Sequence, residues 1–325
     1  MSRISIAGVL VVLGLASACD KTPKQETTTT SAAQTAATTT SATTTPTAEK
    51  NKKLEPLVTF NDDLKTPESV LYDDQADQYL SSNINGKPLD VDNNGYIAKL
   101  GPDGKVVDKN FIVGGKKGVT LNAPKGMAFL DDKLFVADID TVRIFDRKTG
   151  APAGEVKVPG ATFLNDVAAN ADHVFVSDMG AKMGKSGFDP TGTDAVYSID
   201  KTKKLTTIAK SKDLGQPNGL IAQGDKLWVV TMGSGELYSL DMKGKKDGAQ
   251  KMPKGQNDGL VALPSGDLLV TSWEGKAIYR GKPGGEFKPL VEDVTSPADI
   301  GYDTKRSRLL VPSFEKDEIF VFDVR

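Results

Sequence analysis

The stretch Gln216-Pro217-Asn218-Gly219-Leu220 recurs in altered form before each hydrophobic hairpin of this sequence. Five further copies read Pro67-Glu68-Ser69-Val70, Pro124-Lys125-Gly126-Met127, Leu164-Asn165-Asp166-Val167, Asn257-Asp258-Gly259-Leu260 and Pro297-Ala298-Asp299-Ile300. The six copies begin at residues 67, 124, 164, 217, 257 and 297, so three of the intervals are 40 residues and the other two are 57 and 53. A repeat of this length suits one four-stranded blade of a β-propeller.

Short alternating strands follow every copy. The second strand of each repeat is the most regular, and these strands cover residues 78–82, 133–138, 173–178, 226–231, 267–272 and 308–313. We therefore predict an all-β fold, a six-bladed β-propeller with four-stranded blades. The last repeat ends after three strands, whereas Leu57-Val58-Thr59-Phe60 has no hairpin partner. We expect this N-terminal strand to complete the last blade, because such closure removes the exposed sheet edges at the seam.

The composition excludes several classes of function. The chain has 325 residues and a net charge of −2, from 43 acidic and 41 basic side chains. No overall field attracts a polyanion, so we expect no nucleic-acid partner, and we expect a monomer. The single histidine, His173, starts a second strand and is interpreted as a surface residue, which restricts the catalytic schemes available.

The first residues are typical of an export signal. Arg3 precedes an apolar run from Ile4 to Leu15, and the small residues Ala16-Ser17-Ala18 follow. This order predicts a signal peptide over residues 1–18. The segment up to Cys19 resembles a bacterial lipoprotein signal, in which the cysteine becomes the lipidated N-terminus, although Ala16 stands where that family usually has Leu. The alternative is ordinary cleavage after Ala18, with Cys19 a free thiol.

Residues 19–55 are rich in Thr, Ala and Ser and contain few side chains able to pack. We predict a lipidated, disordered tether here, followed by the propeller over residues 56–325. The expected location is the bacterial cell envelope, on the periplasmic side, with the lipid bilayer as a partner through the anchor. The sequence leaves inner and outer membrane open.

The second residue of each copy points to a shared metal site. These residues are, in order, Glu68, Lys125, Asn165, Asn218, Asp258 and Ala298. Innermost strands of a propeller start at one face, so we expect these side chains to converge at one mouth. Two carboxylates and two amide oxygens suit Ca²⁺ far better than Zn²⁺. For a single copy, however, Asn-Gly or Asp-Gly is more typical of a turn, and only the recurrence of oxygen donors at the same position favours the metal site.

Other residues are expected at the same mouth. Asp166 and Asp299, third in their copies, either orient ligands or cap hairpins. Trp273 and Phe314 follow second strands and either line a substrate pocket or pack between blades. The expanded loop from Gly180 to Asp194 contains four glycines and is interpreted as a lid.

From Pro67 to Val324 the chain resembles the senescence marker protein (regucalcin), gluconolactonase and luciferin-regenerating enzyme family. The resemblance rests on the Glu, Asn-Asp, Pro-Asn-Gly and Asp-Gly motifs of repeats one, three, four and five. It implies a six-bladed propeller with one central divalent metal, Ca²⁺ or else Zn²⁺, Mn²⁺ or Mg²⁺. The implied ligands are Glu68, Asn165, Asn218 and Asp258. The histidine pair of the related paraoxonases has no counterpart here.

The resemblance further implies metal-dependent hydrolysis of a small-molecule lactone or ester. Asp258 would be the general base, and Lys125 would orient an anionic group or stabilise the oxyanion. Alternatively, Lys125 forms a salt bridge with Glu68, Asp166 or Asp299 that only balances charge. The competing hypothesis is a non-catalytic propeller in which calcium joins the blades and the mouth binds a sugar, peptide or envelope partner. A condensing role like that of strictosidine synthase lacks a clear counterpart of the expected catalytic carboxylate.

Overall fold

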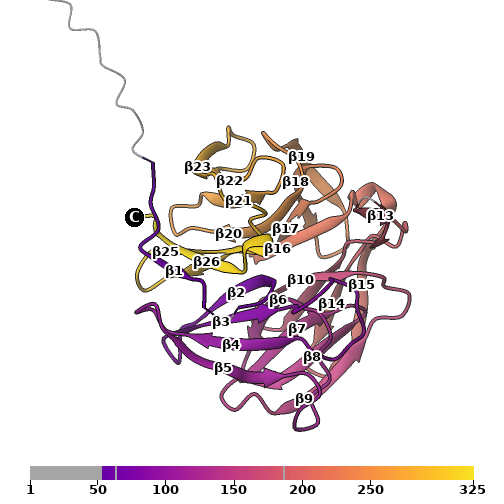
Figure 1. Ribbon diagram of the computed structural model, residues 1–325. Coiled ribbons are helices and arrows are strands. Elements are labelled where there is room, and N and C mark those ends of the chain that lie inside the picture. The colour runs from indigo at the N-terminus through magenta and orange to yellow at the C-terminus, as the bar shows by residue number, and fades with distance from the viewer. Residues whose placement is uncertain (1–52, 63, 186) are drawn as a thin grey trace, which may run out of the picture. The chain divides into compact units, whose positions relative to one another are not determined.

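In the computed structural model of the protein, residues 53–62, 64–185 and 187–325 are described. The predicted signal peptide, Cys19 and the tether up to residue 52 lie outside these residues. The described part forms six four-stranded antiparallel sheets arranged in a ring, with one additional two-stranded hairpin (Figure 1). The prediction of an all-β, six-bladed propeller is confirmed.

Each of blades one to three is numbered from its innermost strand outward. Blade one contains β2 (Pro67–Asp73), β3 (Gln78–Asn83), β4 (Tyr96–Leu100) and β5 (Val106–Val113). Blade two contains β6 (Pro124–Leu130), β7 (Lys133–Asp138), β8 (Thr141–Asp146) and β9 (Pro152–Lys157). Blade three contains β10 (Leu164–Ala169), β11 (His173–Asp178), β14 (Ala195–Asp200) and β15 (Leu205–Lys210), with the hairpin β12 (Ala181–Met183) and β13 (Phe188–Pro190) inserted before β14.

Blades four and five follow the same order, and blade six takes one strand from the start of the fold. Blade four contains β16 (Pro217–Gln223), β17 (Lys226–Thr231), β18 (Glu236–Asp241) and β19 (Lys246–Lys251). Blade five contains β20 (Asn257–Ala262), β21 (Leu268–Ser272), β22 (Ala277–Gly281) and β23 (Lys288–Glu292). Blade six contains β24 (Gly301–Asp303), β25 (Arg308–Ser313), β26 (Glu318–Asp323) and β1 (Val58–Phe60). Two 3₁₀ turns, η1 (Lys212–Leu214) and η2 (Phe314–Lys316), complete the elements.

The ring closes where the sequence predicted. Strand β1 pairs antiparallel with β26, with Val58 opposite Val321 and Phe60 opposite Ile319. Phe60 is buried in a cluster that also contains Ile319 and residues of blade one. The N-terminal strand therefore supplies the outermost strand of the last blade and removes an open edge at the seam.

Glycines let the innermost strands approach one another. A Cβ on Gly219 would lie 2.2 Å from the carbonyl oxygen of Asp258, and one on Gly259 would lie 2.5 Å from the backbone nitrogen of Ile300. Neither glycine has a positive φ. Both lie inside inner strands, so the turn interpretation of Asn-Gly and Asp-Gly is wrong here. Glycine is needed because the backbone of the next blade occupies the space of a side chain.

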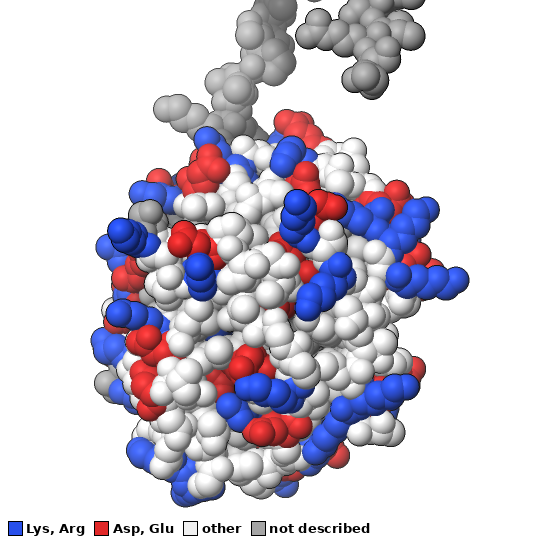
Figure 2. Space-filling view, turned by 90° about the vertical axis from the view of Figure 1, so that its right-hand side faces the viewer, with Lys and Arg blue, Asp and Glu red and all other residues white. Residues whose placement is uncertain are grey.

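The surface carries mixed charge. Figure 2 shows basic and acidic side chains interspersed over one face, with no large area of a single sign. This pattern agrees with the small net charge and with the absence of a polyanion-binding surface on that face. The described part of the chain contains no helix with the length and apolarity needed to span a bilayer.

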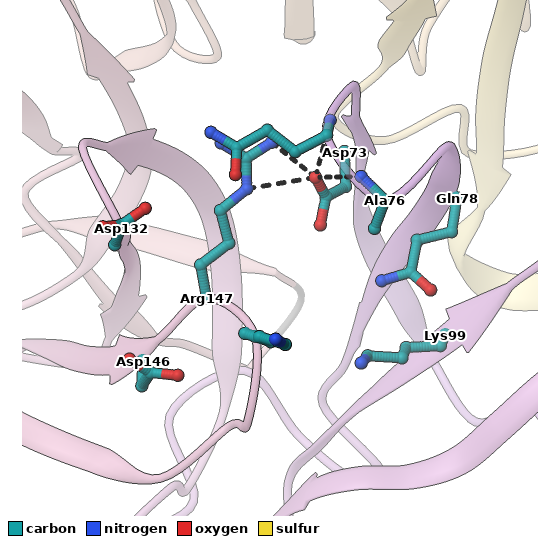
Figure 3. Close-up of a pocket in the computed structure, with 9 residues that line it drawn as sticks. Asp73, Ala76, Gln78, Lys99, Asp132, Asp146 and Arg147 are labelled. Carbon is teal, nitrogen blue, oxygen red and sulfur yellow. Dashed lines mark hydrogen bonds and ion pairs between the residues drawn. The ribbon is translucent and has the colours of Figure 1, made fainter.

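A buried ion pair joins blades one and two at the ends of strands opposite the motif. The guanidinium of Arg147 donates from Nε to Asp73 Oδ1 at 3.0 Å and also contacts Asp74. The backbone nitrogens of Gln75 and Ala76 donate to the same Asp73 oxygen. Figure 3 shows Ala76 and Arg147 on this oxygen. Arg147 also lies 3.9 Å above the ring of Phe129. These contacts satisfy both buried charges, beside a cavity of about 570 Å³.

We expect Arg147→Met to destabilise the protein by about 3 kcal/mol or more, because it leaves the Asp73 carboxylate buried without its cation. Thermal unfolding should show a fall in Tm of about 6 °C or more. The matched control is Arg280→Met, which removes a partly exposed partner of Asp267 and should cost less than about 1 kcal/mol. Equal losses in the two variants would contradict a special role for the Arg147 pair.

Candidate functional site

The second residues of the six copies occupy the same place in the ring. Five are the second residue of an innermost strand, and Ala298 lies just before β24. All are buried, with exposed fractions of 4% or less: Glu68, Lys125, Asn165, Asn218, Asp258 and Ala298. Four of them, Glu68, Lys125, Asn165 and Asp258, line one small cavity. The structure therefore brings the predicted residues together at one end of the ring.

A local irregularity turns these side chains. In five blades the pairing between the first and second strands shifts register at the motif, between Pro67 and Ser69, Pro124 and Met127, Leu164 and Val167, Pro217 and Leu220, and Asn257 and Leu260. An irregularity of this kind bends a strand and redirects a side chain. The second residue is thus released from the regular ladder at the point where it meets the axis.

A second repeated feature fixes the entry to the motif in four blades. The preceding residue has a left-handed backbone, with φ between 44° and 60°, at Thr66, Gln216, Gln256 and Ser296. Its carbonyl accepts a hydrogen bond from the residue just after the second strand, namely Ile84, Met232, Trp273 and Phe314 respectively. Strained backbone of this kind persists only where the surroundings impose it. The hydrogen bond fixes the position of both residues at the mouth.

In blades two and three a carboxylate fixes the loop that leads into the motif. Asp138 accepts hydrogen bonds from the backbone nitrogens of Asn122 and Ala123, and Asp178 accepts one from Phe163. Neither aspartate is exposed to solvent. These two acids close the loops that lead into the motif, which accounts for their burial without a role in binding.

Several polar atoms of the site have no partner among the described residues. They are Glu68 Oε2, Asp258 Oδ1, both amide atoms of Asn218 and Trp273 Nε1. Asn165 donates from Nδ2 to Met179 Sδ at 3.7 Å, which orients its amide. Unpaired buried oxygens are costly, and a hard cation satisfies them. The donor set therefore fits a divalent cation, although no group of three or more His, Cys, Asp and Glu side chains in the described residues has metal-binding geometry.

Burial, together with repulsion from neighbouring acids, raises the pKa values of Glu68 and Asp258. The pKa of Glu68 lies well above its usual range because of burial, and then because of Asp258 and Asp299. Burial raises the pKa of Asp258 to about 7, with a further contribution from Asp166, while Trp273 and Asn218 act in the opposite direction. A bound divalent cation would favour the ionised form of both acids.

Lys125 is the buried cation of this site. Its pKa falls to about 8, mainly through burial, while Glu68 and Asp138 oppose the fall. Its Nζ donates to the carbonyl oxygen of Ala123 at 2.9 Å and lies 4.8 Å from the ring centre of Phe163. Lys125 therefore does not form the salt bridge with Glu68, Asp166 or Asp299 that was considered as an alternative.

Asp166 on β10 and Asp299 just before β24 are the third residues of their motifs, and both line a different space. This is a central channel of about 320 Å³, formed by residues of all six inner strands. Asp166 accepts from the backbone nitrogen of Leu220 at 2.5 Å, and Asp299 accepts from Ser69 Oγ at 2.5 Å. Burial raises the pKa of Asp166 to about 6, and burial also raises the pKa of Asp299 well above its usual range. Both residues connect neighbouring blades and do not cap hairpins.

Large apolar residues surround the open side of the cavity. Trp273 and Phe314 line it, with ring centres 5.3 Å apart. They belong to a set of five lining residues that each directly follow a second strand, and we call this set the apolar collar: Ile84, Met179, Met232, Trp273 and Phe314. The position after each second strand was the signal by which Ile84, Met179 and Met232 could have been found in the sequence.

The expanded loop of blade three reaches the same cavity. Its hairpin β12–β13 places Phe188 in the lining, where the ring packs edge-to-face against Phe163 at 5.2 Å. The cavity itself has a volume of only about 20 Å³. That space holds one water molecule or ion and no organic substrate.

His173 and the cavity beside Arg147 lie away from the site at the mouth. His173 begins β11, at the end of the strand remote from the mouth, and packs near Phe175 with ring centres 6.1 Å apart. The larger cavity beside Arg147 has its buried charges paired, so it offers no unpaired buried group for chemistry.

Comparison with known proteins is informative only at the level of structure. No protein-family model matches the chain, and no curated protein matches it in sequence. A gluconolactonase from Xanthomonas campestris is similar with a TM-score of 0.60 and 17% identity, over 80% of this chain and 87% of that one. A virginiamycin B lyase from Staphylococcus aureus gives a TM-score of 0.57 and 15% identity, over 84% of this chain and 99% of that one.

A luciferin-regenerating enzyme has a TM-score of 0.58 and 15% identity, over 80% of this chain and 91% of that one. Identities this low establish a shared fold and no more. Two of these three neighbours carry the names by which the family in the predicted resemblance is known. The resemblance to the senescence marker protein, gluconolactonase and luciferin-regenerating enzyme family is thus confirmed at the level of the six-bladed fold.

Proposed function

We propose that the protein is a divalent-cation-dependent hydrolase of lactones or related esters, with its reaction centre in the cavity at the mouth of the propeller. The observation that carries this proposal is the ring of two carboxylates and two amides, with unpaired buried oxygens, beside a buried ammonium group. Buried titratable groups whose pKa values are shifted in opposite directions are typical of catalytic sites.

The cation would be held by Glu68, Asn165, Asn218 and Asp258. These oxygen donors favour Ca²⁺, with Mg²⁺, Mn²⁺ or Zn²⁺ as alternatives. When bound, the cation would neutralise the two carboxylates and polarise an ester carbonyl. Lys125 and Ala298 occupy the two positions of the ring that offer no ligand, so the substrate would approach the cation from that side once the apolar lining side chains separate.

The chain itself supplies the groups for hydrolysis. The Asp258 carboxylate takes a proton from the attacking water as the water oxygen bonds to the acyl carbon. The Lys125 ammonium donates a hydrogen bond to the oxygen of the acyl carbon, where negative charge develops. Cleavage of the bond between the acyl carbon and the ester oxygen then returns the proton to the leaving oxygen. A lactone and one water molecule thus give one hydroxy acid.

The single histidine of this chain supports hydrolysis over elimination. One neighbour is described as a gluconolactonase and another as a lyase, and a variant of that lyase with one histidine replaced by alanine is described as catalytically inactive. The single histidine of this chain, His173, lies away from the cavity. Elimination that needs a histidine therefore has no candidate here.

A second function is favoured by one observation. The cavity beside the ligands is about 20 Å³ in volume, which is enough for an ion alone. A non-catalytic propeller, in which calcium joins the blades and the mouth binds a sugar, peptide or envelope partner, would need no larger space. Turnover of any lactone or ester separates the two functions.

We further propose that the protein is exported to the bacterial cell envelope and anchored on the periplasmic side through a lipid on Cys19. The support for this proposal is the charged, apolar and small-residue order of residues 1–18 and the single use of cysteine. Labelling with radioactive palmitate, lost in Cys19→Ser, tests the anchor.

We expect Ca²⁺ to raise the Tm of the purified chain by about 5 °C at a concentration 100-fold above its Kd. In Glu68→Gln this shift should largely disappear, because one ligand charge is lost. Calorimetry with Ca²⁺ and with chelator measures both. A Ca²⁺-induced shift of equal size in Glu68→Gln would contradict the assignment of this residue as a ligand.

Without divalent ions, stability should fall as the pH rises from about 4 to about 7. In the folded state the pKa values of Asp166 (about 6) and Asp258 (about 7) exceed the values of about 4 expected in the unfolded chain. The folded state therefore binds these protons more tightly, and this stabilises it at low pH. The stabilisation is lost as the pH rises through about 6 and about 7. Ca²⁺ should therefore increase the Tm more at pH 8 than at pH 5. Chemical denaturation across this range in chelator measures the trend. A free energy of unfolding in chelator that rises over this pH range would contradict the prediction.

We expect the full chain to hydrolyse at least one lactone or aryl ester, with activity lost in chelator and restored by Ca²⁺. Asp258→Asn should lower kcat by about 10²-fold or more, because the group that accepts the proton of water is lost. Lys125→Met should lower kcat by a similar factor if its ammonium stabilises the oxyanion. The matched control is Lys226→Met, an exposed lysine at the start of β17. No turnover of any lactone or ester, despite stabilisation by Ca²⁺, would favour the binding function.

A further inference from the structure

We propose that this mouth selects lactones or esters with an apolar acyl or aryl group, and that it discriminates against polyhydroxyl lactones such as sugar lactones. The inference rests on the proposed function, because it names the substrate class of that site. It derives from the chemistry of the lining residues of this chain, and it differs from the substrate named for the gluconolactonase neighbour.

The apolar collar is a repeated feature of the ring. In five of the six blades, the residue after the second strand is large and apolar and lines the cavity. In four of those blades a hydrogen bond from its backbone to the neighbouring loop fixes its position: Ile84, Met232, Trp273 and Phe314. In the fifth, Met179 donates in the same way to the carbonyl of Phe163. The collar is therefore held in place by the same device around the ring.

The cavity offers few hydrogen-bond partners for hydroxyl groups. Eight of the twelve residues that line it are apolar or aromatic, and they include Phe163, Phe188 and Pro88 beside the collar. The other four are three of the proposed ligands and Lys125, all of which the reaction uses. A sugar lactone would bury several hydroxyls here without partners, at a cost of roughly 1–3 kcal/mol each. An alkyl or aryl group would instead gain from burial.

Entry requires that apolar side chains separate. The cavity holds no organic molecule at about 20 Å³, and its wall includes the edge-to-face pair of Phe163 and Phe188. Phe188 is carried by the inserted hairpin β12–β13 and is not part of a blade. Thioether and aromatic side chains such as Met179, Met232 and Phe188 can rearrange around an apolar group, since methionine in particular adapts to irregular shapes.

Turnover by the full chain in Ca²⁺ is the first test. We expect kcat/KM for δ-decalactone or phenyl acetate to exceed that for δ-gluconolactone by about ten-fold or more. Phe314→Ser should lower kcat/KM for δ-decalactone by about ten-fold, whereas Phe314→Leu should retain most of it. The matched control is Val107→Ser on β5, whose side chain is exposed and distant in sequence from the collar. A preference for δ-gluconolactone would overturn the inference and leave the hydrolase proposal intact.

Binding without turnover is the second test, and it separates the two proposals. The chain has two tryptophans, so in Trp228→Phe the fluorescence reports on Trp273 alone. We expect saturable quenching by the δ-lactam analogue of δ-decalactone and none by gluconolactam at the same concentrations. If the protein shows this binding but hydrolyses no lactone or ester, the hydrolase proposal is wrong and the proposed selectivity for apolar compounds still holds. The inference is overturned if the apolar compounds show no turnover and no saturable binding.

Discussion

The structure depends on the balance of charge at its axis. Four carboxyl groups, those of Glu68, Asp166, Asp258 and Asp299, are fully buried near one another, and Lys125 is the buried cation among them. Full ionisation of the four acids would leave an excess of negative charge in a region without solvent, which raises their pKa values. Protonation relieves this repulsion, and so would the cation that we propose at the unpaired oxygens of Glu68 and Asp258.

The same geometry that concentrates the charge also holds the ring together. Gly219 and Gly259 allow each inner strand to approach the backbone of the next blade, and Asp166 accepts a hydrogen bond across that contact from Leu220. In five of the six blades, a register shift of the inner strand releases the second residue of the motif from the regular ladder. The repeated motif at the start of the inner strands therefore both packs neighbouring blades together and forms the site.

The sequence predicted the fold more completely than the site. Repeat spacing gave the number of blades, and the unpaired strand at residues 57–60 predicted the closure with β26, since both follow from local strand patterns. The shared position of Glu68, Asn165, Asn218 and Asp258 also followed from the repeat. Two alternatives that the sequence left open are excluded by contacts between blades: the pair Asn218-Gly219 forms no left-handed turn, and Lys125 forms no ion pair with the acids around it.

By itself, the sequence determined that six equivalent units would form, which residue of each unit would face the axis, and which of these could offer oxygen to a cation. Those properties are local, because strand alternation and repeat register are set by near neighbours along the chain. Only the tertiary structure decided how deeply Glu68 and Asp258 are buried, that Lys125 lies over Phe163, and that five residues after the second strands form one collar. The physical reason is that burial, and hence pKa and selectivity, arises from residues that different blades bring together.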